Sequence, residues 1–465
     1  MNITTIDQRD VNINQVEPKK ANWDRYIPAG ADPARLQKDF VKWLNKIGMP
    51  KYYTNDEMKA ALLKDLIYLS KMDSKEYTLY KKYKEIQKKY PIKKQNDISF
   101  LFKTANTKQL EDTAVAETKG LIWRPESPED YLKLEPKLIY TEKKPLYSQR
   151  WTHLREFTST MTNNPNIGRD LRFVIVDART SKYLGCLCLS SDFMDLTGRD
   201  KFIGWNKEIK TTNAMINHTA IGSSIVPTQP LGYNYLGGKL MALLTLSKEP
   251  EQRWEEVYDC KLAGLTTTSL YGSYSQYTNL KYWIHEEKVW NETKTKKIRN
   301  TFKTNGSIRY EPEEYTVKMT REWLKYNYPL RYFEWFAAAK DTGLPLKRDH
   351  KQRALTFLYN KIGIDNKYTE AKHERGVFFC PLFDNSLEFL RMEIGAQQLT
   401  EETRRFDNSE EALTKIWREK YACKRIKNII EKNAFMTETL FYDDLPFMKW
   451  EEVKEKYLPE VGRGK

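Results

Sequence analysis

The sequence lacks long apolar stretches: no uninterrupted apolar run reaches the length of about 18 residues that is typical of a membrane-spanning helix. The N-terminal stretch (MNITTIDQRDVNINQVEPKK) is polar and includes acidic residues, whereas a signal peptide carries an apolar segment behind a basic start. We therefore expect neither a membrane span nor a signal peptide. The expected location is the cytoplasm, without a membrane partner.

Cysteine is scarce as well. The five cysteines stand at positions 186, 188, 260, 380 and 423, an odd number without a CxxC pair, which is typical of free thiols in a reducing compartment. Cys186 and Cys188 share one face of an expected strand, but no histidine stands at ligand spacing from them. We predict no structural zinc finger and no bound metal.

Several catalytic signatures are missing too. The sequence contains nothing that resembles a Ser/His/Asp triad, a Walker phosphate loop or an HExxH metal-binding motif. No internal repeat is visible. These absences disfavour an ATPase and a nuclease.

Basic residues, in contrast, are in excess. Lys and Arg number 78 against 63 Asp and Glu, which gives a formal charge of +15. Such an excess attracts polyanions by counterion release, and DNA or RNA is the expected partner. The 12 Trp, 29 Tyr and 19 Phe add rings on which bases could stack, although most rings should lie in the core. The alternative is a lysine-rich surface that only maintains solubility.

The chain of 465 residues has room for two or three domains. Composition divides it into five segments. The irregular, proline-containing stretch before residue 150 separates a helical region from an αβ region in which two strand patterns, 171–177 and 183–190, form a hairpin. We predict a disordered tail (1–20), an N-terminal helical region (21–103), a linker or arm (104–150), an αβ core (151–290) and a basic, mostly helical C-terminal region (291–465).

Two basic segments of the C-terminal region are candidates for nucleic-acid contact. One is a charge run at 294–303, and the other begins a helix over 347–362. Cations at a helix N-terminus oppose the macrodipole, so a bound anion would relieve that repulsion. A merely solvated basic face is the alternative. The predicted contact residues are Lys296, Lys297, Lys347, Arg348, Lys351 and Arg353.

A glycine-containing turn at 229–244 (QPLGYNYLGGKLMALL) joins an expected strand at 216–227 to an expected helix, and a second strand pattern follows at 261–269. Glycines let backbone N–H groups approach a phosphate, and a helix start favours anions. A turn that is simply packed against its neighbours is the alternative. The candidate phosphate-binding residues are Gln229, Gly232, Gly237, Gly238 and Lys239, and the amides near Ile225 and Val226 would polarise a carbonyl.

Residues 168–280 contain several distinctive strings: RDLRF at 169–173, Leu184-Gly185, Ser190-Ser191, GRDKFIGW at 198–205 and an asparagine-led strand from Asn217 to Pro227. In these strings the segment resembles the core of the DruA proteins of Druantia anti-phage systems. Strand 262–268 and the tyrosine-containing segment 271–279 also correspond. The resemblance implies a protein that acts on or near nucleic acid in phage–host conflict, together with partner proteins of a defence or phage system.

That core is in turn similar to GNAT-like acyltransferases, including the phage Mom proteins that modify adenines in DNA. The similarity implies an α+β fold with a GNAT-like mixed central sheet, flanked by the two helical regions. It also implies acyl-CoA or another nucleotide-type donor. The usual acyl-CoA loop has a second small residue where Asn234 stands here, so the donor need not be acetyl-CoA.

Four residues are candidates for catalysis. His218 could act as a base near neutral pH, although a core histidine is the alternative. Tyr274 and Tyr277 stand where GNAT-type enzymes often place a tyrosine general acid. Asp200 could orient a substrate or form a structural ion pair with Arg199. The leading expectation is a group transferase, an enzyme that modifies a DNA nucleobase; the alternative is a non-catalytic nucleic-acid-binding module of a defence or phage assembly.

Overall fold

The computed structural model describes residues 33–46, 48–89, 114–159, 168–233, 236–269, 275–290, 297–304, 306–337, 349–437 and 448–462. They belong to two compact units, each built from two stretches of the chain. The first unit combines Met1–Ser74 with Ser307–Lys372, and the second combines Lys75–Gly306 with His373–Lys465. Neither unit is therefore continuous in sequence.

The first unit is mainly helical. Thr54 begins one of its helices with a capping box, in which its hydroxyl accepts from the Glu57 N–H and its own N–H donates to the Glu57 carboxylate. The buried Trp323 side chain donates to Asn55 Oδ1 at 3.0 Å. The elements are α3 (Pro33–Lys46), α4 (Asn55–Leu69), β8 (Ser307–Arg309), α13 (Glu314–Asn327), α14 (Pro329–Tyr332), η4 (Phe333–Ala337), α16 (Asp349–Ile362), η5 (Asn366–Tyr368) and β9 (Glu370–Lys372), which pairs antiparallel with β8.

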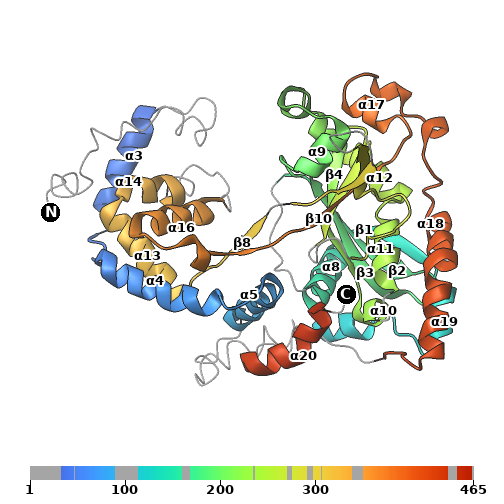
Figure 1. The fold of residues 1–465 in the computed structure, drawn as a ribbon, viewed down its shortest axis with the longest axis horizontal. Coiled ribbons are helices and arrows are strands. Elements are labelled where there is room, and N and C mark those ends of the chain that lie inside the picture. The colour runs from blue at the N-terminus through green and yellow to red at the C-terminus, as the bar shows by residue number, and fades with distance from the viewer. Residues whose placement is uncertain are drawn as a thin grey trace. The chain divides into compact units, whose positions relative to one another are not determined.

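The second unit is built around a central sheet (Figure 1). The sheet has six strands in the order β1-β2-β3-β4-β5-β10. All neighbours are antiparallel except β4 and β5, which run parallel and are joined by a helical crossover. The strands are β1 (Pro136–Tyr140), β2 (Asp170–Asp177), β3 (Lys182–Ser191), β4 (Thr219–Pro227), β5 (Gly264–Ser269) and β10 (Gly376–Pro381). A mostly antiparallel central sheet with helices around it confirms the expected α+β class.

Alternation along β2 assigns the two faces of this sheet. Phe173 belongs to the main core, with side chains of the crossover helix α11 (Gly237–Leu244), whereas Val174 packs with Trp151 of α8 (Pro145–Thr158). Helices α11 and α18 (Glu410–Trp417) thus cover one face and α8 covers the other.

Further elements complete the second unit. The helices are α5 (Ser74–Lys89), η1 (Pro128–Lys133), α9 (Thr197–Ile203), η2 (Glu208–Thr212), η3 (Met215–His218), α10 (Gln229–Tyr233), α12 (Lys248–Tyr258), α17 (Ser386–Leu390), η6 (Ala396–Gln398), η7 (Glu401–Thr403), η8 (Arg418–Ala422), α19 (Cys423–Glu431) and α20 (Trp450–Gly462). β6 (Glu286–Trp290) and β7 (Lys297–Thr301) form a separate antiparallel pair. None of the helices that the structure describes combines the length and apolar composition needed to cross a bilayer.

The predicted hairpin is confirmed by β2 and β3, but the sheet extends beyond the predicted core range. Its edge strand β1 lies within the segment predicted to be a linker or arm, and β10 comes from the predicted C-terminal region. β1 begins at Pro136, and an edge strand tolerates proline because its missing N–H faces away from the sheet. The prolines that indicate a linker in the sequence therefore flank a strand.

Candidate functional site

The GRDKFIGW string forms α9 and a buried ion network. Arg199 is completely buried, with Nη1 at 2.6 Å from the buried carboxylate of Asp192 and Nη2 at 2.6 Å from Asp200. Lys210 pairs with the second Asp200 oxygen at 2.8 Å, and the Thr266 hydroxyl donates to Asp192 at 2.7 Å. Both Asp200 oxygens are already engaged. The geometry therefore favours the structural ion pair over a substrate-orienting role for Asp200.

Gly204 and Trp205 of the same string also have structural roles. Gly204 ends α9 with φ at 87°, a left-handed conformation that favours glycine. The Trp205 indole N–H donates to the Leu390 carbonyl at 2.7 Å, and its ring lies beneath the Arg199 guanidinium, 5.2 Å from the ring centroid. The most specific motif in the sequence thus fastens α9 and its surroundings to the sheet.

His218 lies immediately before β4. Its Nδ1 is 2.7 Å from the Lys261 carbonyl oxygen, which can only accept, so Nδ1 carries the proton in this contact. Burial lowers the pKa of His218, and the nearby Arg169 charge lowers it further, while the bond to Lys261 opposes both effects. Ile225 lies seven positions further along the strand, a span of about 23 Å at about 3.3 Å per residue. His218 is therefore at the opposite end of β4 from the glycine turn.

Tyr277 is a buried core residue. Its ring packs against Trp283 and Phe378, and its hydroxyl accepts a 2.8 Å hydrogen bond from Gln276 Nε2. Burial raises the pKa of this hydroxyl, while hydrogen bonds lower it. Tyr274, the other predicted general acid, lies outside the described residues.

The glycine turn is filled by protein atoms where the structure describes it. A Cβ at Gly237 would lie 2.6 Å from Leu231 Cγ, and one at Gly238 would lie 2.5 Å from Gln276 Oε1. The Gly232 N–H already donates to the Thr228 carbonyl at 2.8 Å. These contacts support the packed-turn alternative for Gly237 and Gly238. Gln229 lies in α10 at the end of β4.

The amide groups expected to polarise a carbonyl belong to β4. Ile225 and Val226 lie opposite Leu187 and Cys186 of β3, and the Ile225 carbonyl accepts from Gln276 Nε2 at 3.2 Å. Backbone groups at this end of β4 are thus partly committed to sheet pairing and to the 275–281 turn.

Lys239 connects the turn to a neighbouring segment. Its Nζ donates to the carbonyls of Gln276 at 3.2 Å and Thr278 at 2.7 Å, and it lies 5.2 Å from the centroid of the Tyr421 ring. Burial lowers its pKa to about 8. Within the described part of the chain no carboxylate pairs with this amine, so Lys239 binds backbone oxygens where a phosphate was expected.

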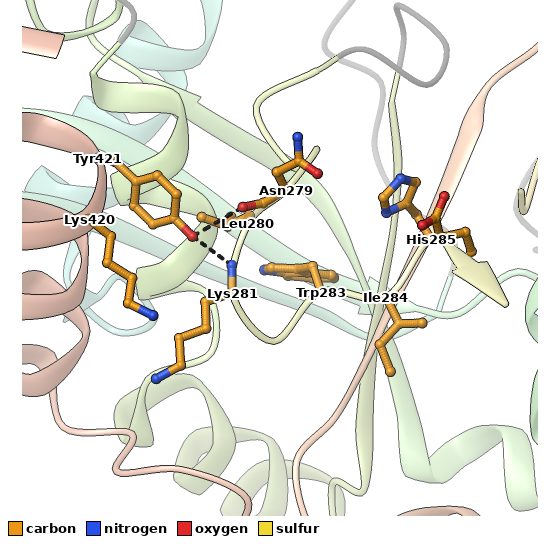
Figure 2. A pocket seen from close by; sticks show the side chains of 9 residues that line it. Asn279, Leu280, Lys281, Trp283, Ile284, His285, Lys420 and Tyr421 are labelled. Atoms are coloured by element: carbon orange, nitrogen blue, oxygen red, sulfur yellow. Dashed lines mark hydrogen bonds between the residues drawn. The ribbon is translucent and has the colours of Figure 1, made fainter. Parts of the chain in front are cut away.

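Tyr421 also forms part of a pocket of about 540 Å³ (Figure 2). One wall is the segment 279–286, which leads into β6, and the other is η8. The Lys281 N–H donates to the Tyr421 hydroxyl at 2.9 Å, and that hydroxyl donates to the Asn279 carbonyl at 3.2 Å, as the dashed lines in Figure 2 show. The lining residues are Asn279, Leu280, Lys281, Trp283, Ile284, His285, Glu286, Lys420 and Tyr421.

A separate set of polar side chains lies at a bulge in β4. In the pairing of β3 with β4, Cys188 lies opposite Ser224, and the next residue, Leu189, lies opposite Gly222. Ser223 is therefore the extra residue of the bulge. Its hydroxyl is 2.8 Å from the Ser190 hydroxyl. Cys188 Sγ donates to Asp170 at 2.7 Å, and burial raises the pKa of that thiol to about 12. We call Asp170, Cys188, Ser190 and Ser223 the bulge cluster. Burial thus favours the protonated thiol, which is a poor nucleophile.

The predicted nucleic-acid residues are only partly described. Lys296, Lys347 and Arg348 lie outside the described residues. Lys297 lies in β7, whereas Lys351 and Arg353 lie in α16, so these residues belong to different units. Where the structure describes the chain, no group of His, Cys, Asp and Glu side chains has the geometry of a metal site.

Comparison with known proteins places these features in a family. Residues 132–392 match the family model described as Druantia protein DruA. The chain belongs to the DruA family. A DruA protein of Escherichia coli (strain UMEA 4076-1) is 28% identical over 141 residues, which cover 28% of this chain and 34% of that relative. The alignment thus spans about a third of the relative's length. No solved structure matches.

The DruA match includes all six strands of the sheet, the ion network of α9 and one wall of the pocket, because it runs from Leu132 to Met392. Lys420 and Tyr421 lie beyond it. The sequence prediction missed the pocket. The sequence signals for it are Lys281 and the basic positions of η8 and α19, which form a site only because the fold brings together residues 140 positions apart.

Proposed function

We propose that this DruA-family chain binds nucleic acid as a component of an anti-phage defence system. The observation that carries the proposal is the pair of lysines, Lys281 and Lys420, on opposite walls of one pocket. Both side chains are exposed, and within the described residues neither amine pairs with a carboxylate. Two unneutralised amines beside a single lining acid, Glu286, favour a polyanion.

The surroundings extend this positive character. Lys424, also exposed, follows Lys420 by four residues, which places it one turn further along the same helical face. The chain as a whole carries a formal charge of +15. Lysine contacts to phosphates release counterions, so each such contact strengthens nucleic-acid binding.

The test is the binding of a labelled single strand and a labelled blunt duplex, each of about 20 nucleotides, followed by fluorescence anisotropy. The double variant Lys281→Glu with Lys420→Glu is expected to bind at least one of these probes about tenfold more weakly than the native chain. A matched control is Lys201→Glu with Lys207→Glu, which makes the same charge change at two exposed lysines around α9. The proposal is contradicted if both double variants lose the same amount of affinity for the probes, or if the native chain binds neither probe.

A second candidate is the expected GNAT-like group transfer with acyl-CoA or another nucleotide-type donor, and the divergence of β4 from β5 favours it. The two strands pair over only three positions, from Thr219 to Ile221. Beyond them, side chains replace the β5 backbone: Thr267 donates to the Gly222 carbonyl and Gln276 to the Ile225 carbonyl, both at 3.2 Å. Ligands often bind at the carboxyl ends of such parallel strands.

The bulge cluster adds to the support for group transfer. Bulges are common beside active sites, because they redirect side chains. Ser223 keeps part of its surface exposed although β4 is a central strand. We rank this candidate second because Tyr277 is buried, His218 lies at the other end of β4, and Gly237 and Gly238 contact protein atoms.

A further inference from the structure

We infer that the pocket between residues 279–286 and η8 accepts an unpaired nucleotide, so that the chain binds single-stranded nucleic acid in preference to a continuous duplex. This inference rests on the proposed nucleic-acid binding and names its substrate class.

The shape of the site favours an unpaired nucleotide. A duplex is recognised in its major groove, about 12 Å wide, by a protruding helix or β-ribbon. The site of about 540 Å³ is an open surface recess that does not protrude, and it has the size of a site for one small molecule. A base can enter such a site only when it is unpaired or turned out of its stack.

The chemistry of the walls fits a nucleotide. The exposed Lys281 and Lys420 amines can contact the backbone phosphates. The rings of Tyr421 and His285 are both partly exposed and can stack with a base. The Asn279 amide can donate to and accept from the edge of a base. Phosphate, ring and base-edge contacts are therefore present in one site.

The two rings are held in place before any ligand binds. The Tyr421 hydroxyl bonds to both Lys281 and Asn279, and the Lys239 ammonium lies near its ring. The His285 ring stacks on Phe378, with ring centroids 5.2 Å apart. Fixed rings lose little conformational entropy on binding, so they favour stacking.

Backbone strain is an independent observation at the same wall. Asn279 and Tyr282 both have positive φ, 56° and 78°, although neither is glycine. Asparagine tolerates such a conformation, whereas a tyrosine in it is strained, and strained backbone concentrates at functional sites. Here the hydrogen bond that the Asn279 carbonyl accepts from the Tyr421 hydroxyl holds the first residue, and stacking on Phe406, with centroids 3.9 Å apart, holds the second. Contacts with Tyr421 and Phe406 thus hold this wall of the pocket against the rest of the unit.

The test uses the full chain and three DNA probes of one sequence: a single strand, a blunt duplex, and the same duplex with a central single-stranded gap. We expect the single strand and the gapped duplex to bind about tenfold or more tightly than the blunt duplex. Lys281→Glu with Lys420→Glu should remove most of this difference, whereas Lys201→Glu with Lys207→Glu should preserve it.

Tyr421→Phe separates the ring from its hydroxyl bonds. It keeps the stacking surface but frees the 279–282 wall, so we expect a several-fold loss for the single strand and little change for the blunt duplex, with thermal unfolding showing that the fold is intact. Blunt-duplex binding that equals single-strand binding and is lost in the Lys281/Lys420 variant overturns the inference and leaves the proposed function standing. Failure of all three probes to bind overturns both.

Discussion

Lys239 is a residue whose surroundings disfavour its own charge. Among the residues that the structure describes, its amine contacts two carbonyl oxygens and the Tyr421 ring, and burial lowers its pKa from 10.5 to about 8. The unfolded chain therefore binds more protons than the folded chain between about pH 8 and pH 10. Folding stability should rise with pH across that window, because the folded state no longer has to keep this amine charged.

We expect the native chain and Lys239→Met to differ in how their free energies of unfolding depend on pH. From about pH 7.5 to about pH 9.5, the free energy of unfolding of the native chain should increase relative to that of Lys239→Met, which has no amine to titrate. Urea unfolding followed by tryptophan fluorescence measures both chains. Lys201→Met, at an exposed position of α9, should follow the native chain. If the native chain and Lys239→Met respond to pH in parallel, the folded Lys239 keeps an ordinary pKa.

Helix α9 is a short element whose position depends on one arginine. Removal of Arg199 leaves the carboxylates of Asp192 and Asp200 without their shared cation in a buried site. Breaking a buried pair on one side costs about 3–5 kcal/mol, so we expect Arg199→Met to lower the free energy of unfolding by that amount. Urea unfolding midpoints measure the loss.

The double variant Asp192→Leu with Arg199→Met distinguishes a lost ion pair from lost packing. It removes both charges, and Lys210 still pairs with Asp200, so its cost should be smaller than the sum of the two single variants. If the loss of unfolding free energy in the double variant equals the sum of the losses in the two single variants, Asp192 and Arg199 are not energetically coupled. Lys201→Met on the same helix should cost less than about 0.5 kcal/mol.

Local patterns were enough to predict several elements. The alternation in LRFVIVD and YLGCLCLS predicted the hairpin of β2 and β3, and the glycine turn does stand between β4 and a helix. They failed where tertiary context decides. The residue pattern places His218 in a strand, yet η3 precedes β4 there. The same kind of reasoning predicts a phosphate contact at Gly238, although the side chain in contact with it, Gln276, is distant in sequence.

At the scale of the whole molecule, the important pairings join distant parts of the chain. Each compact unit takes two separate stretches, and the pocket joins Lys281 to Tyr421. A linear division of the sequence cannot show such pairings, because composition and periodicity report only on neighbours. The overall charge, in contrast, is visible in the sequence, and it indicated a polyanion without indicating where the polyanion binds.

The two candidate functions of the whole chain differ in whether the nucleic acid is chemically changed. Binding leaves nucleosides intact, whereas group transfer adds the mass of the donated group. We expect nucleosides from the DNA of cells that express the chain to match those of cells without it in mass spectrometry. An oligonucleotide with an acylated adenine, added in known amount, establishes sensitivity. A shifted nucleoside that disappears with Ser223→Ala would instead assign group transfer to the bulge cluster, because Ser223 lies where β4 and β5 diverge.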